Sequence, residues 1–370
     1  MPKLSSVFQM DRFPVPETVK AFSDVFRKNG FSLYVVGGAV RDYLLGIENH
    51  DYDFCTDALA EEVCKMFHAV IPTGIKHGTV TVLFRGQSFE VTTFRTETDY
   101  SDHRHPDGVS FVRTLDEDLS RRDFTVNAFA ADCTTGEITD IFNGREDLKN
   151  RVIRAIGEPK QRFREDALRL LRMCRFCSKL GFEPDRITFS AAQSLASFIS
   201  YVSQERIYDE LSKILKSTKP SVGLRLAEDC GLISYILPEL AECRNTKQEK
   251  TGSSDVLEHI YNAVDAAASA GYCHEVRLAC LLHDIGKPSS MTVKDGVMKF
   301  YGHDTSGAEM AVKVMKRLKC SNKTIDEVHT IIANHMVRYS RDWTDGAVKR
   351  FMCRIGSEVT IHHLFEMGRT

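Results

Sequence analysis

Two aspartates separated by one residue, Asp51 and Asp53, are the pair of side chains in this sequence best suited to chemistry. Side chains two positions apart on a strand face the same way, so both carboxylates would point to one side. Two carboxylates on one face can hold Mg²⁺, the usual companion of a nucleoside triphosphate. Glu90 lies in a run that alternates with apolar residues, and it is either a third acidic ligand or an exposed glutamate at a sheet edge.

The segment in front of the aspartates, YVVGGAVRDYLLG (34–46), has the pattern of an anion site. Its apolar run predicts a buried strand that ends at Gly37 and Gly38, where glycine lets the backbone turn sharply beside a ligand. Helical spacing follows, and a helix N-terminus after such a turn attracts phosphate. Together with the aspartates, this segment predicts nucleotidyl transfer. In that reaction one Mg²⁺ activates a 3′-hydroxyl and a second stabilises the departing pyrophosphate.

A second motif, DLSRRDFTVNAFA (118–130), carries groups suited to phosphate and sugar. Arg121 and Arg122 are adjacent, and the guanidinium fork matches phosphate oxygens. Asn127 follows five residues later and can hydrogen-bond a sugar hydroxyl. The alternative is that the motif is a capped structural segment.

A third motif, REDALRLLRMCRF (164–176), is predicted to be helical. Asp166 and Arg169 are three residues apart, so their side chains would be neighbours on the helix surface. They form either a structural salt bridge or a flat polar edge that can pair with the Watson–Crick face of C or A. Arg172 and Arg175 extend a basic stripe along the same helix.

Length and composition bound the class of protein. The chain has 370 residues, 42% of them apolar and 27% charged, which predicts two or three domains with ample core. No apolar run approaches the roughly 18 residues of a membrane span. Eleven scattered cysteines, including the pair Cys174 and Cys177, indicate reduced thiols and a cytoplasmic location.

Charge distribution matters more than the net charge of −2. Residues 149–225 hold 16 Lys or Arg against 8 Asp or Glu, a local surplus of eight positive charges. Polyanion binding needs a basic surface rather than a basic total, so this stretch is either a nucleic-acid contact or a solvated helical face.

The hydrophobic periodicity divides the chain into a mixed first part and helical later parts. After a helix at 12–28, short strands run from 31 to about 140 and include a hairpin of 79–84 and 88–94. The polar stretch 96–108 is predicted to be a mobile loop, and 242–255 a linker. Helices are predicted at 165–182, 188–200, 204–216 and 220–230, and from the linker to the end of the chain.

These motifs jointly resemble the class II tRNA nucleotidyltransferase and bacterial poly(A) polymerase family. VGGAVRDYLLG…DYD, RRDFTVNA, REDALRLLRMCRF and ERIYDELSKIL match in order over residues 31 to about 240, and the CCA-adding branch is the more similar one. The resemblance implies an α+β chain with three domains. These are a nucleotidyltransferase-type mixed-sheet head (1–147), an all-α neck and body that selects nucleotide and binds RNA (148–250), and a helical HD-type domain (251–370).

The resemblance also implies an activity, a cofactor and partners. The activity is template-independent addition or repair of the 3′-terminal CCA of tRNA from CTP and ATP with two Mg²⁺. The helical middle would grip the tRNA acceptor arm, the loop at 96–108 would reshape the pocket from C to A selection, and no membrane is involved. The rivals are an enzyme that adds only A or only CC, a poly(A) polymerase, and a chain whose main activity is HD-domain phosphohydrolysis.

Site residues follow from the resemblance position by position. The resemblance implies that Asp51 and Asp53 bind the two Mg²⁺. Asp51, Asp53 and Glu90 are the expected catalytic residues. Contacts to the nucleotide, base reading by Asp166 and Arg169 included, are expected of Gly37, Gly38, Arg41, Arg122, Asp123, Asn127, Asp166, Arg169, Arg172 and Arg175.

The C-terminal third resembles HD-type metal-dependent phosphohydrolases through His259, LLHDIGKP (281–288) and FYGHDTSGAEMA (300–311). The resemblance implies a divalent transition metal held by imidazole and carboxylate. The expected ligands are His259, His283, Asp284 and Asp304, with His303, His335 and Asp345 as alternatives for the fourth. The alternative to hydrolysis is a helical tRNA-binding body without chemistry. The sequence stops at Thr370 within a helical pattern where many relatives continue, so the chain is either truncated or a natural short form.

Overall fold

The computed structural model describes residues 12–49, 51–98, 108–250, 253–294, 297–337, 342–356 and 358–368. The chain divides into two compact units. The first comprises residues 1–169 and 183–191, and the second comprises residues 170–182 and 192–370. The division falls within α8 (Leu168–Leu180), directly after Arg169, and again within α9 (Arg186–Ser194).

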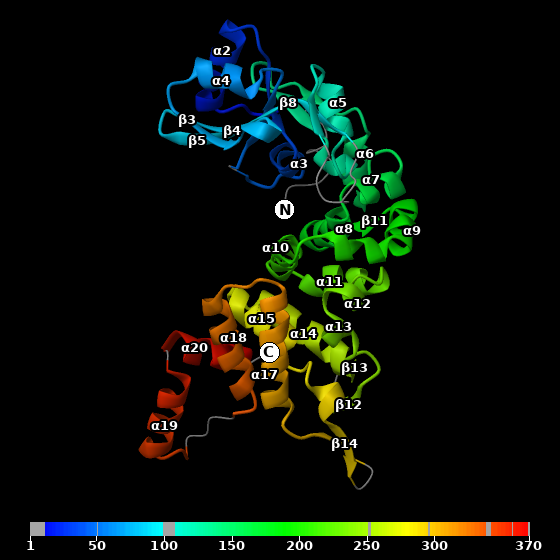
Figure 1. Cartoon of the computed structure of the whole chain (residues 1–370), viewed down its shortest axis with the longest axis vertical. Helices are drawn as coiled ribbons and strands as arrows, with labels where there is room; N and C mark the ends of the chain where they lie inside the picture. Colours follow the sequence, from blue (N-terminus) through cyan, green and yellow to red (C-terminus); the bar gives the residue numbers. More distant parts are fainter. Residues whose placement is uncertain are drawn as a thin grey trace. The chain divides into compact units, whose positions relative to one another are not determined.

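The first unit is built on a seven-stranded mixed sheet of order β3-β4-β5-β2-β1-β8-β9 (Figure 1). The strands β2 and β5 are parallel neighbours, and the other pairs are antiparallel. The strands are β1 (Leu33–Val36), β2 (Asp53–Thr56), β3 (Val70–Gly74), β4 (Thr79–Phe84), β5 (Gln87–Thr93), β8 (Ala130–Asp132) and β9 (Ile138–Thr139). A separate hairpin pairs β6 (Arg95–Thr98) with β7 (Gly108–Phe111).

Helices pack against apolar side chains on both faces of this sheet. On one face Phe22 of α2 (Glu17–Lys28) is fully buried, with its ring stacked 4.7 Å from Phe89 and edge-on to Phe54. On the other face Leu119 of α5 (Leu115–Ser120) packs against Val36. The further helices of this unit are α3 (Gly38–Leu44), α4 (Ala60–Met66), α6 (Gly144–Asn150) and α7 (Pro159–Glu165), with 3-10 turns at Ile75–His77 and Thr125–Asn127.

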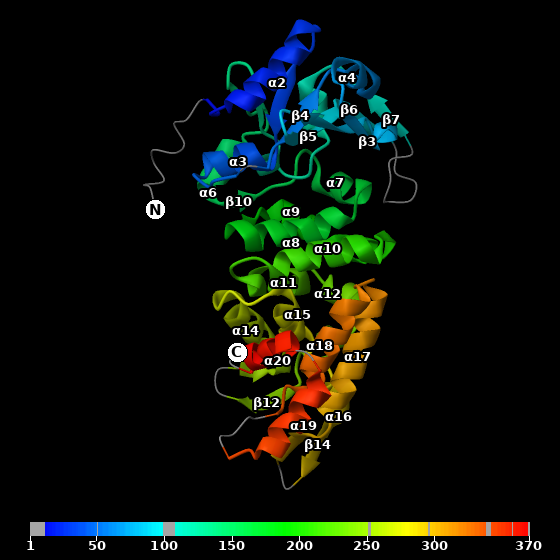
Figure 2. The same ribbon diagram turned by 90° about the vertical axis from the view of Figure 1, so that its left-hand side faces the viewer.

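The second unit is almost entirely helical (Figure 2). The largest apolar run lies on α15 (His274–Leu282), whose last five residues are all buried by neighbouring helices. The other helices are α10 (Gln204–Leu215), α11 (Pro220–Asp229), α12 (Ile233–Ile236), α13 (Pro238–Ala241), α14 (Val256–Ser269), α16 (Lys287–Ser290), α17 (His303–Arg317), α18 (Asn322–Asn334), α19 (Asp345–Ile355) and α20 (Glu358–Met367). Two short hairpins join β12 (Lys247–Lys250) to β13 (Ser253–Asp255) and β14 (Met291–Lys294) to β15 (Val297–Phe300).

The predicted α+β class, with a mixed sheet followed by helices, is confirmed, but several boundaries are wrong. The predicted helix 165–182 is α8, which begins later, at Leu168, and ends at Leu180, while Glu165 is the last residue of α7. The predicted helix 188–200 is α9 followed by a 3-10 segment, Ala196–Tyr201. Part of the predicted linker forms β12 and β13. Residues 99–107 of the predicted mobile loop lie outside the described residues, and 96–98 belong to β6.

All eleven cysteines are free thiols. Eight of them are buried, including Cys174 and Cys177, and Cys273 is half-buried. Cys64 in α4 and Cys353 in α19 are exposed. Within the residues that the structure describes, no helix combines the length and the apolar character needed to cross a membrane.

Candidate active site

The acidic residues lie at the junction of the two parallel strands. Because β2 and β5 are parallel and in register, Asp53 is the direct neighbour of Glu90. Asp51 stands two residues before β2, and its backbone N–H donates to Oδ1 of Asn49 at 2.8 Å. All three acidic residues line one open depression of about 800 Å³. The structure therefore brings together the three acidic residues that the sequence analysis singled out.

The acidic residues disturb one another electrostatically. Desolvation in the depression raises the pKa of Asp53, and the nearby carboxylate of Asp51 raises it further, while Arg122 acts in the opposite direction. Desolvation and then Asp53 and Asp51 raise the pKa of Glu90. Carboxylates that repel one another in this way gain stabilisation from a divalent cation placed among them. The donor set consists only of oxygen, which suits Mg²⁺.

Guanidinium groups face the same carboxylates from the sheet surface. A second depression of about 240 Å³ shares Asp53 and Glu90 with the first and is also lined by Arg95, Arg121 and Arg122. Oxygen ligands for a cation and positive groups for phosphate oxygens therefore border one space. This is the arrangement expected for a metal-bound triphosphate.

One fully buried carboxylate, Asp118 of α5, positions two of these arginines. Its Oδ1 accepts from Nη2 of Arg121 at 2.7 Å, and its Oδ2 accepts from Nη2 of Arg122 at 3.3 Å. Burial alone would raise the pKa of Asp118, but the two guanidinium groups hold it below its usual value. The sequence analysis missed this residue. The spacing D-x-x-R-R, three and four residues apart on a helix, was the available signal.

The glycine turn lies directly against this arginine. Gly37 has a φ of 68°, a left-handed conformation that favours glycine. A Cβ added there would stand 3.1 Å from Nη1 of Arg122 and 3.7 Å from the carbonyl oxygen of Asn127. Gly38 follows as the first residue of α3. The turn is therefore where the backbone comes closest to the arginine motif.

Arg41 is buried and holds part of the site in place. Its Nη1 donates to Oδ1 of Asn127 at 2.5 Å, and its Nη2 donates to Asp42 at 2.6 Å. Nδ2 of Asn127 donates in turn to Oδ1 of Asp123 at 3.0 Å. The predicted nucleotide contacts Arg41, Asp123 and Asn127 thus form one hydrogen-bonded network. Asp42 belongs to it as well and was not singled out from the sequence.

The third motif is arranged differently from the prediction. Asp166 lies between α7 and α8 rather than inside a helix, and its Oδ1 accepts from the backbone N–H of Leu168 at 3.1 Å. The Arg169 guanidinium donates to Glu165 at 2.7 Å and to the backbone carbonyl of Arg121 at 2.8 Å. The helix breaks at Asp166 because its carboxylate caps the start of α8.

Arg172 and Arg175 belong to the second unit. Nε of Arg175 donates to Glu210 of α10 at 2.5 Å, and its guanidinium lies 4.0 Å from the centroid of the Phe176 ring. Nη1 of Arg172 is 3.9 Å from the same glutamate. Glu210 is almost fully buried, and its position in ERIYDELSKIL was the signal for it in the sequence.

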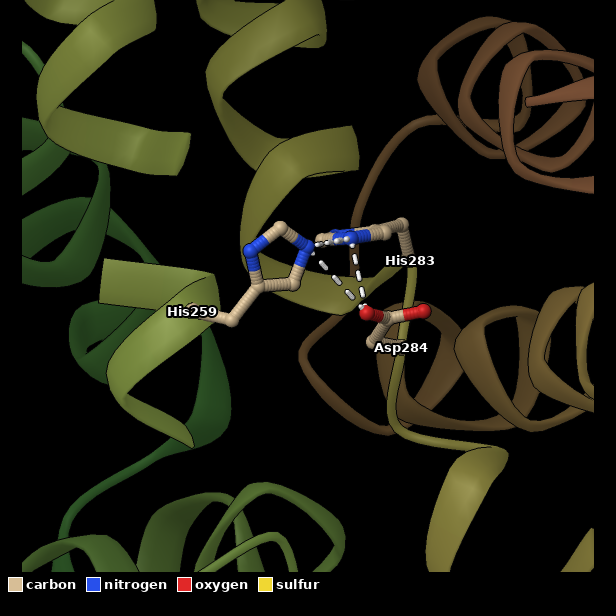
Figure 3. A group of neighbouring side chains, drawn as sticks. All are labelled: His259, His283 and Asp284. Atoms are coloured by element: carbon tan, nitrogen blue, oxygen red, sulfur yellow. Dashed lines mark hydrogen bonds and ion pairs between the residues drawn. The ribbon is translucent and has the colours of Figure 1, made fainter. Parts of the chain in front are cut away.

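A second group of potential ligands lies in the HD-like part (Figure 3). Oδ2 of Asp284 is 3.0 Å from Nε2 of His283 and 3.4 Å from Nε2 of His259, which comes from α14. Nδ1 of His283 lies 2.8 Å from the carbonyl oxygen of Cys280. Since a carbonyl only accepts, Nδ1 carries the proton and Nε2 is left free to act as a ligand.

Two further histidines approach the other oxygen of the same carboxylate. Oδ1 of Asp284 is 3.5 Å from Nε2 of His303 and 3.9 Å from Nε2 of His335. Each of these rings also bonds a backbone carbonyl through Nδ1. Nε2 of His303 is buried without a hydrogen-bond partner, as expected of an atom prepared for a metal. Lys287 is also close, with its Nζ 2.6 Å from Oδ2 of Asp284.

The fourth HD ligand predicted from the sequence, Asp304, is not among the ligand groups found in the described residues, whereas its neighbour His303 is. The two residues are adjacent at the start of α17, so their side chains point about 100° apart around the helix. Only His303 faces Asp284. The alternative His335 is brought in, from the C-terminal end of α18.

We expect Gly286→Ala to destabilise the second unit. A Cβ at this position would lie 2.7 Å from both the carbonyl oxygen of His303 and the backbone nitrogen of Gly307, so the turn after Asp284 and α17 would have to separate. Overpacking of this kind costs about 1–3 kcal/mol, which should lower the midpoint of thermal unfolding by several degrees. Gly346→Ala is the matched control, because its Cβ would lie 3.4 Å from the flexible end of Arg350 and 4.0 Å from Oγ1 of Thr344, which are ordinary contacts. Equal midpoints for the two variants would contradict this prediction.

Comparison with known proteins matches three stretches of the chain to described protein families. Residues 33–154 match the family described as "Poly A polymerase head domain", residues 181–244 match "Probable RNA and SrmB- binding site of polymerase A", and residues 256–358 match "HD domain". A CCA-adding enzyme of Enterococcus faecalis is 37% identical over 333 residues, which cover 89% of this chain and 73% of that protein. The chain belongs to the class II CCA-adding enzyme and poly(A) polymerase family.

Solved structures of this family support the assignment. The crystal structure of Bacillus stearothermophilus CCA-adding enzyme in complex with CTP superposes with a TM-score of 0.72 at 33% identity, covering 95% of this chain and 78% of that one.

A CCA-adding enzyme of Ligilactobacillus salivarius is 47% identical over 209 residues, 56% of this chain and 52% of that protein. The matched part of this chain thus spans about half the length of several curated relatives.

Proposed function

We propose that the chain adds or repairs the 3′-terminal CCA of tRNA, using CTP and ATP as substrates. The observation that carries this proposal is the acidic group of Asp51, Asp53 and Glu90 in one depression, two of whose members, Asp53 and Glu90, also line a second depression with Arg121 and Arg122. Family membership supports it, since relatives with high identity are named CCA-adding enzymes. A related structure from Thermotoga maritima was solved with tRNA, although its 20% identity supports the fold alone.

Some residues of the site would bind the nucleotide, and others would hold the Mg²⁺ ions that activate the tRNA 3′-hydroxyl. Asp51 and Asp53, with Glu90 beside them, would hold two Mg²⁺, which supply activation of the tRNA 3′-hydroxyl and charge stabilisation of the pyrophosphate. Arg122 would bind phosphate oxygens beside the turn at Gly37 and Gly38. Asn127, held by Arg41 and Asp123, would accept or donate a hydrogen bond at the ribose. The 3′-hydroxyl attacks the α-phosphate, and pyrophosphate leaves.

We propose that Asp166 and Arg169 read the incoming base, helped by Arg172 and Arg175. A carboxylate acceptor and a guanidinium donor can pair with the Watson–Crick face of C or A. The contacts of Arg169 with Glu165 and the Arg121 carbonyl support a fixed orientation of its guanidinium. The segment 96–108, of which residues 99–107 lie outside the described residues, is our candidate for the part that changes between C and A selection.

We expect Asp166→Ala to weaken discrimination of C and A against G and U while Mg²⁺ binding is retained. Losing one bidentate or paired base contact typically costs about 1–3 kcal/mol of discrimination, or roughly 5- to 150-fold. Single-nucleotide addition with each of the four triphosphates measures this ratio. Unchanged ratios would show that the base is read elsewhere. Glu165→Gln is a useful comparison, because it disturbs the partner of Arg169 and leaves the carboxylate at 166 in place.

One experiment separates the rival nucleotidyltransferases. The protein is incubated with tRNA that ends before CCA, with tRNA that ends after CC, and with a generic RNA, supplying CTP and ATP singly and together. Complete CCA on the first substrate supports the proposal. Extension of the second substrate alone indicates an A-only enzyme, and a stop after CC indicates a CC-only enzyme. Long A tails on the generic RNA indicate a poly(A) polymerase.

A second candidate function is metal-dependent phosphohydrolysis by the HD part. The observation that favours it is the group of histidines around Asp284, with the buried unpartnered Nε2 of His303. A divalent transition metal fits this donor set and would supply an activated water. Asp51→Ala should abolish RNA extension and leave any phosphodiesterase activity unchanged, whereas His283→Asn should do the reverse. Loss of both activities in either variant would contradict two separate sites.

We further propose that the chain works in three parts: 1–147 for catalysis, 148–250 for nucleotide selection and tRNA binding, and 251–370 as the HD part. The positive surplus over 149–225 supports contacts with the phosphates of an acceptor arm. Eleven cysteines, none of them in a disulfide, support a cytoplasmic location.

A further inference from the structure

The last described helix carries a set of side chains that the nucleotidyl-transfer function does not use. Sγ of Cys273, at the start of α15, lies 3.4 Å from Nε2 of His363 in α20. A carboxylate oxygen of Glu366, one turn further along α20, completes a group whose ligand atoms all lie within 4.8 Å of one another. One soft thiol, one imidazole and one carboxylate therefore converge from two helices.

A fourth residue fixes the histidine in the orientation that a metal ligand needs. Nδ1 of His363 lies 2.5 Å from Oε1 of Glu327, which comes from α18. With Nδ1–H donated to this carboxylate, the lone pair of Nε2 faces the thiol of Cys273. A carboxylate behind a histidine is the arrangement that orients and strengthens metal-binding imidazoles.

We propose that Cys273, His363 and Glu366 bind a zinc ion that fastens α20 to α15, with Glu327 orienting the histidine. A tetrahedral zinc with Zn–S of about 2.3 Å and Zn–N of about 2.0 Å separates sulfur and nitrogen by about 3.5 Å. The observed 3.4 Å between Sγ and Nε2 is close to that edge, so the sulfur and the nitrogen already have the separation that a shared zinc ion requires. Thiolate with imidazole favours zinc over the hard cations, and water takes the fourth position.

The site is chemically distinct from the histidine group around Asp284. That group offers imidazole and carboxylate but no thiol ligand. It is formed by α14, α15, α17 and α18, whereas the zinc site depends on α20, which packs against α15 and α18 (Figures 1 and 2). Only the proposed zinc site contains a thiolate, so only this site can give the absorption band of a thiolate bound to a metal. The plain alternative is a thiol–imidazole hydrogen bond without a metal.

Cobalt(II) titration of the full chain tests the proposal, because a thiolate bound to cobalt gives an intense charge-transfer band in the near ultraviolet. We expect this band in the wild-type chain and in His283→Asn, and we expect zinc to abolish it by displacement. Cys273→Ser should lack the band. Cys353→Ser, which removes an exposed thiol of α19, is the matched control and should retain it. No band in the wild-type chain, or a band that persists in Cys273→Ser, overturns the proposal.

Hydrogen exchange provides a readout that does not depend on any variant folding correctly. A ligand at about one hundred times its Kd suppresses opening of its site about 100-fold. Added zinc should therefore slow exchange of the α20 amides by about that factor in the wild-type chain and leave α2 of the first unit unchanged. Equal exchange of α20 with and without zinc would also overturn the proposal.

Discussion

Asp53→Asn is expected to reduce nucleotide addition to tRNA by at least about 10³-fold while the protein remains folded. Asp53 and Glu90 both line the two depressions and are direct neighbours in the parallel strand pair. The amide keeps the shape of the side chain but removes the charge that a divalent cation needs. Single-turnover extension of tRNA lacking CCA at saturating CTP measures the loss.

The stability of the same variant separates a chemical defect from a folding defect. Desolvation and the nearby carboxylate of Asp51 raise the pKa of Asp53 in the folded chain, so ionisation of this side chain is less favourable in the folded than in the unfolded chain. Removing that charge should leave the midpoint of thermal unfolding unchanged or higher, measured without added metal. Asp24→Asn, at an exposed position of α2, is the control and should match the wild type in both assays. An active Asp53→Asn variant would refute the acidic group as the catalytic centre.

Asp118→Ala is expected to lower the free energy of unfolding of the first unit by about 3 kcal/mol. The carboxylate is fully buried and is the shared partner of Arg121 and Arg122, so its removal leaves two guanidinium groups without their anion. Asp116→Ala, two residues away on α5 but exposed, should cost less than about 0.5 kcal/mol. Urea unfolding followed by circular dichroism compares the two variants.

The pH dependence of that difference follows from the direction of the pKa shift. Because the pKa of Asp118 is lowered in the folded chain, its contribution is fully present above the ordinary aspartate value of about 3.9. The contribution is lost as the pH falls through the lower folded-state pKa. The difference in the free energy of unfolding between the wild type and Asp118→Ala should thus be constant from pH 5 to 8. It should shrink only in strong acid. A gap that narrows near neutral pH would point to another group.

Family membership was easier to predict from this sequence than the geometry of the candidate site. The D-x-D spacing and the alternation around Glu90 predicted the acidic group, because the period of a strand decides on which side a residue lies. The break at Asp166 was missed, since a capping carboxylate and a mid-helix carboxylate look alike in an apolar repeat. Asp304 was predicted in place of its neighbour His303 because the sequence does not show which side of α17 faces Asp284. The packing of α17 against Asp284 decides which of these adjacent side chains points toward it.

Residues that support others were harder still to predict. Asp118, Asp42 and Glu210 contact arginines that the motifs identified, but a buried carboxylate is recognised only when its partner is known to be near. The helix spacing of Asp118 to Arg121 was readable in the sequence. The pairing of Glu210 with Arg175 spans 35 residues, and no local pattern predicts it.

The distribution of exposed thiols allows the chain to be labelled with fluorescent dyes at its own cysteines. Cys64 and Cys353 are exposed, one in each compact unit, whereas desolvation raises the pKa of the half-buried Cys273 and makes it a slower nucleophile. A maleimide dye should therefore attach at one position per unit without any engineered cysteine. Donor and acceptor fluorophores introduced this way would follow, through their energy-transfer efficiency, how the two halves respond as an RNA end is extended.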